Sequence, residues 1–161
     1  VLILGAGGAA RAAVVECLNQ QAESIRILNR SKDRLDAMLS NLSNLEVFES
    51  IIPVQVKEDL ADLPKTGICI NATSLGLKPN DPLPLNINVL STEWSVYDMV
   101  YNPQETRLFI EAQKHGCPVK TGLSMLVHQG AKALEIWTGK EVDPQIMHKL
   151  VKQALENQGN R

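Results

Sequence analysis

The chain has 161 residues, of which 44% are hydrophobic and 21% are charged, a composition typical of one globular domain with a substantial core. Its 16 Lys and Arg against 18 Asp and Glu give a net charge of −2, which argues against a nucleic-acid-binding surface, and no apolar run approaches the roughly 20 residues of a membrane span. The three cysteines, Cys17, Cys69 and Cys117, lack C-x-x-C spacing, so we expect free thiols in a reducing cytoplasm.

The first ten residues, VLILGAGGAA, predict a strand that runs into a glycine-rich turn and then a helix. They match the dinucleotide-binding pattern G-x-G-x-x-A through Gly5, Gly7 and Ala10. Gly5 permits the tight turn, Gly7 lets backbone N–H groups approach a pyrophosphate, and the small Ala10 lets the helix pack closely on the strand. The helix N-terminus then directs free amides at the phosphates. The residues predicted to lie against the cofactor here are Gly5, Ala6, Gly7, Gly8 and Ala9.

The end of the second predicted strand indicates which dinucleotide is bound. NAD-binding domains usually place an acid there, roughly 20 residues after the glycines, to hold the ribose 2′-hydroxyl. This sequence instead reads NRSKDR over residues 29–34, and Asp33 falls inside the following helix. Guanidinium groups bind a 2′-phosphate through charge-assisted hydrogen bonds, so NADP is favoured over NAD, the alternative being an ordinary solvated basic patch. The residues predicted at this end of the cofactor are Asn29, Arg30, Ser31 and Arg34.

Short β-rich runs alternate with helical segments along the rest of the chain. The helix after the fifth strand is expected to start with Asn102 as N-cap, Pro103 at the first helical position and Glu105 at N3. Pro53 places the third strand at a sheet edge, and residues 77–88 predict a loop. The predicted strands are residues 1–4, 24–28, 51–56, 67–71, 94–98 and 118–121. The predicted helices are residues 9–20, one capped by Ser31, one from 102 to 115, one from about 123 to 137, and a last one opened by Asp143 and Pro144.

Apolar residues at helical spacing form one stripe on each of three of these helices. They are Val14, Val15 and Leu18 in the first helix, Leu35, Met38, Leu39 and Leu42 in the second, and Ile146, Met147, Leu150, Val151, Ala154 and Leu155 in the last. We interpret Trp94 and Trp137 as packing residues. Together the elements predict an α/β fold of Rossmann type: a doubly wound, six-stranded parallel sheet of order 3-2-1-4-5-6 with helices on both faces, in one domain over residues 1–161.

Three further segments carry a family resemblance: INATSLG at residues 70–76, YDMVYNPQET at 97–106 and GLSMLVHQGAKALEIWTG at 122–139. Together with GAGGAARA and NRSKDR they span nearly the whole chain, and the set resembles the nucleotide-binding half of shikimate dehydrogenase. Members of that family reduce 3-dehydroshikimate to shikimate with NADPH, in the pathway to aromatic amino acids. Related members act on quinate or use NAD. The resemblance therefore implies an NADP-dependent oxidoreductase with a small-molecule substrate.

The resemblance also places cofactor-binding residues at the carboxyl ends of the strands, where open α/β sheets hold their ligands. The backbone of Met99 and Val100, with Gly122 opposite, would flank the nicotinamide. Met99, which is polarizable and adaptable, suits an apolar wall there, and the plain alternative is a core residue. The residues implied at this edge are Asn71, Thr73, Ser74, Met99, Val100 and Gly122.

Tyr101 and Gln129 are the substrate contacts that the resemblance implies. Shikimate is a small polyol carboxylate, so it needs neutral side chains that both donate and accept hydrogen bonds. Gln129 follows Gly122 by two helical turns, which matches the family's spacing. The alternatives are a half-buried loop aromatic for Tyr101 and a surface residue for Gln129.

No catalytic residue is assigned to this chain. In the family, a Lys paired with an Asp in a preceding substrate-binding domain supplies the proton that a reduced carbonyl needs. Lys78 and Lys120 lie outside the recognised motifs, and we interpret them as solvated. We therefore expect a domain of a longer enzyme that binds NADP(H) but does not turn over shikimate alone. His115, His128 and His148 lack a second ligand at metal spacing, so no metal is predicted.

Two other functions stay open: a stand-alone NADP-binding or regulatory module without catalysis, and a quinate/shikimate dehydrogenase that uses NAD. In the family the C-terminal helices return towards the first domain. The apolar stripe of the last helix is therefore either partly exposed in this chain or used to form a homodimer.

Overall fold

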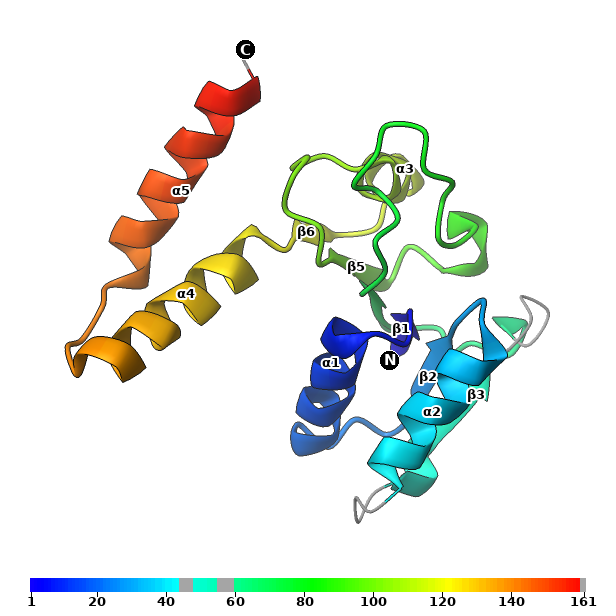
Figure 1. Cartoon of the computed structure of the whole chain (residues 1–161). Helices are drawn as coiled ribbons and strands as arrows, with labels where there is room; N and C mark the ends of the chain where they lie inside the picture. The colour runs from blue at the N-terminus through cyan, green and yellow to red at the C-terminus, as the bar shows by residue number, and fades with distance from the viewer. Residues whose placement is uncertain (44–47, 55–59, 160–161) are drawn as a thin grey trace.

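The computed structural model describes residues 1–43, 48–54 and 60–159, which build one six-stranded parallel sheet with helices around it (Figure 1). The order across the sheet is β3-β2-β1-β4-β5-β6 and every pairing is parallel, which confirms the predicted topology. The strand containing Pro53 is an edge strand, as predicted, although residues 55–56 of that prediction lie outside the described residues. The strands are β1 (Leu2–Leu4), β2 (Ile25–Leu28), β3 (Ile51–Val54), β4 (Gly67–Asn71), β5 (Trp94–Asp98) and β6 (Val119–Thr121).

The sheet is covered on both faces because successive side chains of a strand point to opposite sides. Ile3 of β1 packs with residues of α1 (Gly8–Asn19) and α2 (Lys32–Leu42). Leu2 and Leu4 pack on the other face with α3 (Arg107–His115) and the segment 85–90. That segment includes the short 3-10 helix η3 (Ile87–Val89), so the predicted loop over residues 77–88 ends slightly too late. The result is the expected three-layer α/β/α arrangement of Rossmann type.

The helices on the Ile3 face follow the sequence pattern with one exception. Ser31 caps α2, its Oγ accepting a hydrogen bond from the backbone N–H of Arg34 at 3.4 Å, as predicted. Val14 and Leu18 of α1 are buried, as predicted, but Val15 is 36% exposed. A residue one position beyond Val14 lies about 100° further round the helix axis, and the small Ala10 and Ala13 complete the core face instead.

The predicted start of α3 is wrong. The helix begins at Arg107, and its N-cap is Thr106 rather than Asn102; the Asn102–Pro103 peptide bond is cis. Thr106 is buried, its Oγ1 accepts from the backbone N–H of Phe109 at 3.1 Å, and the same hydroxyl donates to Asp98. A buried partner outside the helix therefore fixes the cap. The other end of α3, at His115 and Gly116, is as predicted.

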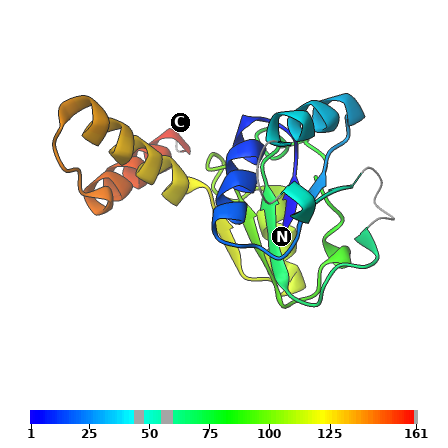
Figure 2. The ribbon, with the colours of Figure 1, turned by 90° about the horizontal axis from the view of Figure 1, so that it is seen from below.

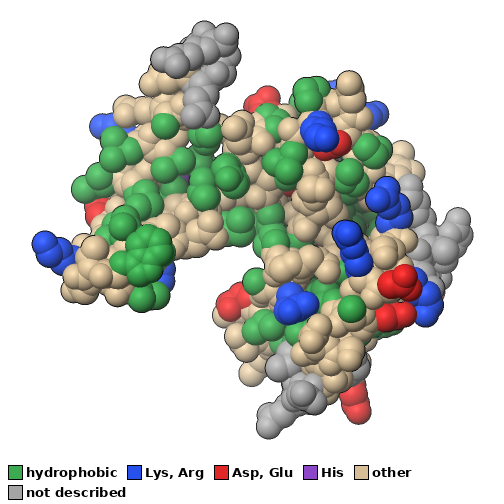
Figure 3. Space-filling view, viewed as in Figure 1, with side chains coloured by type: hydrophobic (Ala, Val, Ile, Leu, Met, Phe, Trp, Pro, Cys, Tyr) green, Lys and Arg blue, Asp and Glu red, His purple; other side chains and the backbone are tan. Residues whose placement is uncertain are grey.

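Helices α4 (Leu123–Thr138) and α5 (Pro144–Gly159) form a hairpin that projects from the sheet (Figures 1 and 2). The predicted bounds of these two helices lie close to the observed ones. The C-cap of α4 is Gly139, whose backbone is in the left-handed conformation. Trp137 is 77% exposed, so its interpretation as a packing residue is wrong, whereas Trp94 is buried as predicted. Ile146 and Leu150 are also exposed, and Figure 3 shows hydrophobic side chains gathered along this hairpin.

The three cysteines are free, as expected. Cys69 and Cys117 are buried and Cys17 is partly buried, and burial raises the pKa of the Cys69 thiol to about 12. No helix in the described ranges is both long and apolar enough to cross a membrane.

Candidate functional site

The glycine-rich loop leads from β1 into α1 at the carboxyl edge of the sheet. Gly5 has a φ of +108°, and a Cβ there would lie 3.0 Å from the carbonyl oxygen of Ala72, so only glycine fits. A Cβ on Gly7 would meet no atom within 4 Å. Gly7 is also the N-cap of α1, whose first turn has neither a side-chain cap nor an acidic residue among the described residues. Open space in front of uncapped N–H groups fits an anion.

Two arginines stand beside this loop, Arg30 at the end of β2 and Arg34 in the first turn of α2. Both are exposed, and neither forms an ion pair with a described carboxylate. Asn29 donates from Nδ2 to the backbone oxygen of Ser31 at 2.7 Å, which fixes the turn that carries Arg30. Two guanidinium groups without carboxylate partners among the described residues, one just after β2 and one in the first turn of α2, fit the extra phosphate of NADP.

A pocket of about 290 Å³ joins the glycine loop, the arginines and the loop after β4. It therefore brings together predicted residues from three separate parts of the sequence. Ser31 and Asn71 do not line it, but each hydrogen-bonds a residue that does, Arg34 and Thr73 respectively. Gly8 and Ala9 are exposed in the first turn of α1. The predicted site residues that line the pocket are Gly5, Ala6, Gly7, Asn29, Arg30, Arg34, Thr73 and Ser74.

A second part of the predicted site lies where β5 meets the start of α4. The N–H of Gly122 donates to the carbonyl oxygen of Val100 at 3.3 Å, and a Cβ on Gly122 would lie 2.1 Å from the carbonyl oxygen of Met99. Glycine is therefore required at position 122, and the three residues form one close contact. That they flank a nicotinamide stays a prediction. None of them lines the 290 Å³ pocket, so that pocket covers only part of the predicted cofactor site.

The two predicted substrate residues are accessible, but they do not line the 290 Å³ pocket. Tyr101 is 37% exposed after β5, and Gln129 is exposed on α4. Lys78 and Lys120 are exposed as well. Within the described ranges, no three His, Cys, Asp or Glu side chains group so that they could hold a metal ion.

Sequence reasoning missed a buried polar cluster under these loops, formed by Asn71, Asp98 and Thr106. Burial raises the pKa of the Asp98 carboxyl, and hydrogen bonds from Thr106, Val100 and Asn71 lower it in part. A signal was present: Trp94, Val96 and Asp98 alternate along β5, so they share one face, and the two apolar members indicate that this face is buried.

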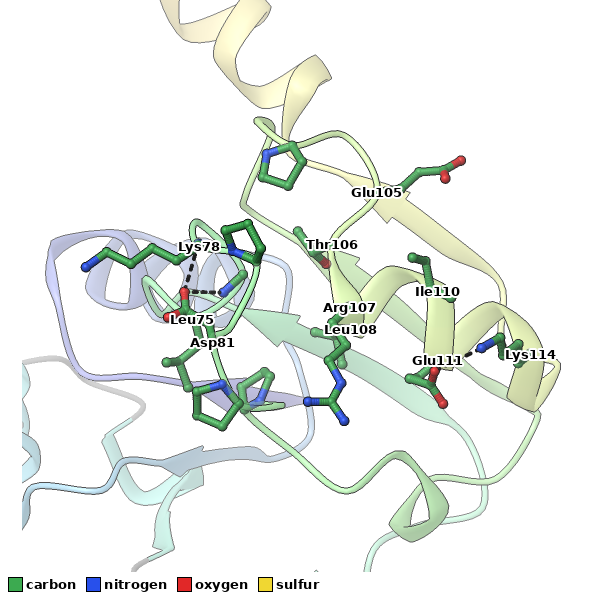
Figure 4. Close-up of a pocket in the computed structure, with 15 residues that line it drawn as sticks. Leu75, Lys78, Asp81, Glu105, Thr106, Arg107, Leu108, Ile110, Glu111 and Lys114 are labelled. Atoms are coloured by element: carbon green, nitrogen blue, oxygen red, sulfur yellow. Dashed lines mark hydrogen bonds and ion pairs between the residues drawn. The ribbon is translucent and has the colours of Figure 1, made fainter. Parts of the chain in front are cut away.

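A second pocket, of about 450 Å³, lies between the loop over residues 75–84 and α3 (Figure 4). Asp81 shapes that loop, its Oδ2 accepting from the N–H groups of Gly76 and Lys78 at 3.0 Å each. Leu75 and Pro84 line both pockets, so this loop is a shared wall. Its lining mixes acidic and basic side chains, and it includes the ends of the segments 70–76 and 97–106.

The fold and the glycine-rich site define a domain of the dinucleotide-binding Rossmann class. Residues 122–152 match the family model described as the shikimate 5′-dehydrogenase C-terminal domain. Shikimate dehydrogenase (NADP(+)) of Symbiobacterium thermophilum is 37% identical over 161 residues, covering 98% of this chain and 55% of that protein. The chain belongs to the shikimate dehydrogenase family.

Two solved structures of similar fold illustrate the range of relatives. Shikimate 5-dehydrogenase from Thermus thermophilus in complex with NADP(H) and shikimate has a TM-score of 0.76 and 35% identity, over 96% of this chain and 54% of that one. Ligand-free 5-ketofructose reductase of a Gluconobacter strain has a TM-score of 0.78 and 37% identity, over 97% of this chain and 55% of that one. The chain spans about half the length of the curated relatives that it matches.

Proposed function

We propose that this chain is the NADP(H)-binding domain of a shikimate dehydrogenase. The observation that carries the proposal is the pocket in which the uncapped start of α1 lies beside Arg30 and Arg34. The names of the relatives support it, since the curated ones are shikimate dehydrogenases (NADP(+)). The reaction proposed for the whole enzyme is reduction of 3-dehydroshikimate to shikimate.

Binding of the cofactor phosphates needs only features that the described residues already provide. The N–H groups after Gly7 receive the pyrophosphate, because the space above that glycine is open. Arg30 and Arg34 receive the 2′-phosphate, because they lack carboxylate partners among the described residues. Asn29 and Ser31 orient this arginine-bearing turn through their own hydrogen bonds.

The bound dinucleotide would supply a hydride to the substrate carbonyl from its nicotinamide ring. In this proposal the backbone of Met99 and Val100, with Gly122 packed directly against it, forms one wall beside that ring. The half-buried Met99 side chain excludes water from the wall. Tyr101 and Gln129 are exposed and free to hydrogen-bond a polyol carboxylate.

No proton donor for the carbonyl is proposed from this chain, because Lys78 and Lys120 are exposed and line no part of the cofactor pocket. The Lys and Asp pair is proposed to come from a part of the enzyme outside the aligned half. A second candidate substrate class is a sugar ketone, favoured by the 37% identity to 5-ketofructose reductase. A nucleotide-binding module without catalysis is the third candidate.

Calorimetric titration of the chain with NADP⁺ and NAD⁺ tests cofactor binding. We expect the chain to bind NADP⁺ more tightly than NAD⁺. Arg30→Asp should lower the affinity for NADP⁺ by about 10- to 100-fold, because a charge-assisted hydrogen bond to the 2′-phosphate is lost, and should leave the affinity for NAD⁺ nearly unchanged. Lys149→Asp, the same charge change on the exposed face of α5, is the matched control and should alter neither. If Arg30→Asp does not change the preference for NADP⁺ over NAD⁺, Arg30 does not bind the 2′-phosphate.

Turnover separates the binding domain from the complete enzyme. We expect no NADP⁺-dependent oxidation of shikimate by the chain alone. Oxidation at the rate of an intact family member would contradict the assignment of the acid–base pair to another part of the enzyme.

A further inference from the structure

Three polar side chains are buried in the described part of the chain, and two of them hydrogen-bond to the third, Asp98. They are Asn71 at the end of β4, Asp98 at the end of β5 and Thr106 at the N-cap of α3, with exposed fractions of 0%, 0% and 2%. Asp98 Oδ1 accepts from Asn71 Nδ2 at 2.9 Å, and Oδ2 accepts from Thr106 Oγ1 at 2.5 Å. Burying a carboxylate is costly, and apolar residues of similar volume are often at least as stabilising. Stability alone is therefore a weak explanation for this cluster.

On one side the cluster fixes the loop that follows β4. The side-chain oxygen of Asn71 accepts from the N–H of Thr73 at 3.1 Å and from its hydroxyl at 2.7 Å, while Nδ2 also donates to the carbonyl oxygen of Leu75 at 3.2 Å. Thr73 Oγ1 in turn accepts from the N–H of Leu75 at 3.0 Å. Residues 72–75 line the cofactor pocket, so Asn71 sets the shape of one pocket wall.

On the other side the cluster fixes the backbone that follows β5. Asp98 Oδ1 accepts from the N–H of Val100 at 3.1 Å, and the carbonyl oxygen of Val100 accepts from Gly122. Thr106 reaches back to the first loop, because a Cβ on Gly76 would lie 3.1 Å from its Cγ2. One carboxylate thus links both ligand-facing loops and the start of α3, segments up to 35 residues apart in sequence (71 to 106).

We infer that Asp98, Asn71 and Thr106 are positioning residues that hold the loop after β4 and the Met99–Val100 backbone in one arrangement, so that the nicotinamide half of a dinucleotide finds its site already formed. The inference rests on the proposed NADP(H) binding. It assigns no contact with the cofactor to Asp98, which is covered by its own partners. A preformed site lowers the ordering cost of binding. The loop after β4 shares a pocket with the arginines, so its share of that gain falls on both halves of the ligand, whereas only the nicotinamide half reaches the Met99–Val100 backbone.

The test compares two ligands in two variants of Thr106. Thr106→Val removes the hydroxyl at nearly constant volume and leaves Asp98 Oδ2 without its donor, whereas Thr106→Ser keeps the hydroxyl. The ligands are NADP⁺ and adenosine 2′,5′-bisphosphate, which lacks the nicotinamide half. We expect Thr106→Val to lower the affinity for NADP⁺ by about tenfold or more and the affinity for the bisphosphate by less than about threefold. Thr106→Ser should bind both ligands like the wild type.

Thr92→Val provides the matched control, because it makes the same chemical change at an exposed threonine outside the cluster. If Thr106→Val lowers the affinities for both ligands equally, or leaves the affinity for NADP⁺ unchanged, the inference is overturned and the cluster is purely structural. A wild-type chain that binds neither ligand would refute the proposed function itself, and the inference with it. If Arg30→Asp loses affinity for NADP⁺ but Thr106→Val does not lose more affinity for NADP⁺ than for the bisphosphate, the inference is refuted and the proposed function stands.

Two further measurements cover the case in which Thr106→Val does not fold. Asp98→Asn keeps the side-chain volume but presents an amide where the cluster needs an acceptor, and the same split between the two ligands is expected. In the wild-type chain without ligand, hydrogen exchange should show the Val100 amide as slow as the sheet amides. Exchange at the rate of an open loop would overturn the inference without any variant.

Discussion

Gly5 and Gly7 lie two residues apart in one loop but meet different surroundings. A side chain at Gly5 meets the backbone of Ala72 and needs a left-handed φ of +108°, whereas one at Gly7 meets only open space. The first glycine is therefore required by the fold, and the second is required only if a ligand occupies that space.

Alanine substitutions separate these two requirements. We expect Gly5→Ala to lower the free energy of unfolding by about 1–3 kcal/mol, the cost of a strained backbone position. Gly7→Ala should lower the free energy of unfolding by less than about 1 kcal/mol, the difference between alanine and glycine at an N-cap. It should nevertheless weaken the binding of NADP⁺ strongly, because the alanine methyl group enters the space proposed for the pyrophosphate. Urea unfolding and calorimetric titration measure the two effects. A Gly7→Ala chain that binds NADP⁺ like the wild type would place the phosphates elsewhere.

At this scale the sequence predicted the residues whose roles depend on local backbone geometry. Gly5 and Ser31 behave as expected because a turn or a helix cap depends on neighbours within a few residues. The role of Gly7 towards a pyrophosphate stays a prediction. Asp98 and Thr106 were missed because their pairing joins a strand end to a helix start through burial. A pattern of alternation along one strand reports burial, but it does not name the partner.

Among the elements, the strands and most helix ends were predictable, and the start of α3 was not. Asn102, Pro103 and Glu105 have every local feature of a helix start, but the hydrogen bond from Thr106 to buried Asp98 holds the cap four residues later. Glycines show the same dependence on context within α4. Gly122, its N-cap, packs against Met99, whereas Gly130 in its interior faces the side chain of Met147.

Substitution of these two glycines should have opposite effects. A Cβ on Gly130 would lie 3.4 Å from Met147 Sδ, an ordinary contact with a flexible side chain. Gly130→Ala should therefore stabilise α4 by about 0.5–1 kcal/mol through helix propensity. Gly122→Ala should destabilise the chain, because its Cβ would collide with the carbonyl oxygen of Met99. Thermal unfolding followed by circular dichroism checks both, and a destabilised Gly130→Ala would mean that Met147 is held rigidly.

In the whole molecule, the sheet and the hairpin differ in how they are held. The sheet is enclosed by two apolar clusters, one on each face. The hairpin projects from it (Figure 2). The buried residues of α4 (Leu123, Val127 and Ala131) lie within its first nine residues, while Ile136 and Trp137 near its end are exposed. The sequence predicted both helices correctly, but a helical stripe does not indicate whether a partner covers it. Homodimer formation through α5 stays a prediction.

This arrangement predicts that the chain does not unfold in a single step, because local stability follows the number of buried apolar contacts. Trp137→Phe leaves Trp94 as the one tryptophan, a 1% exposed reporter of the core whose Nε1 donates to the carbonyl oxygen of Pro64 at 2.9 Å. In urea, part of the helical circular dichroism should be lost before the fluorescence of Trp94 changes, and Gly130→Ala should delay only that early loss. Repeating the titration over a range of protein concentrations controls for association through the exposed face. Coincident transitions at every concentration would show that the hairpin and the sheet unfold as one unit.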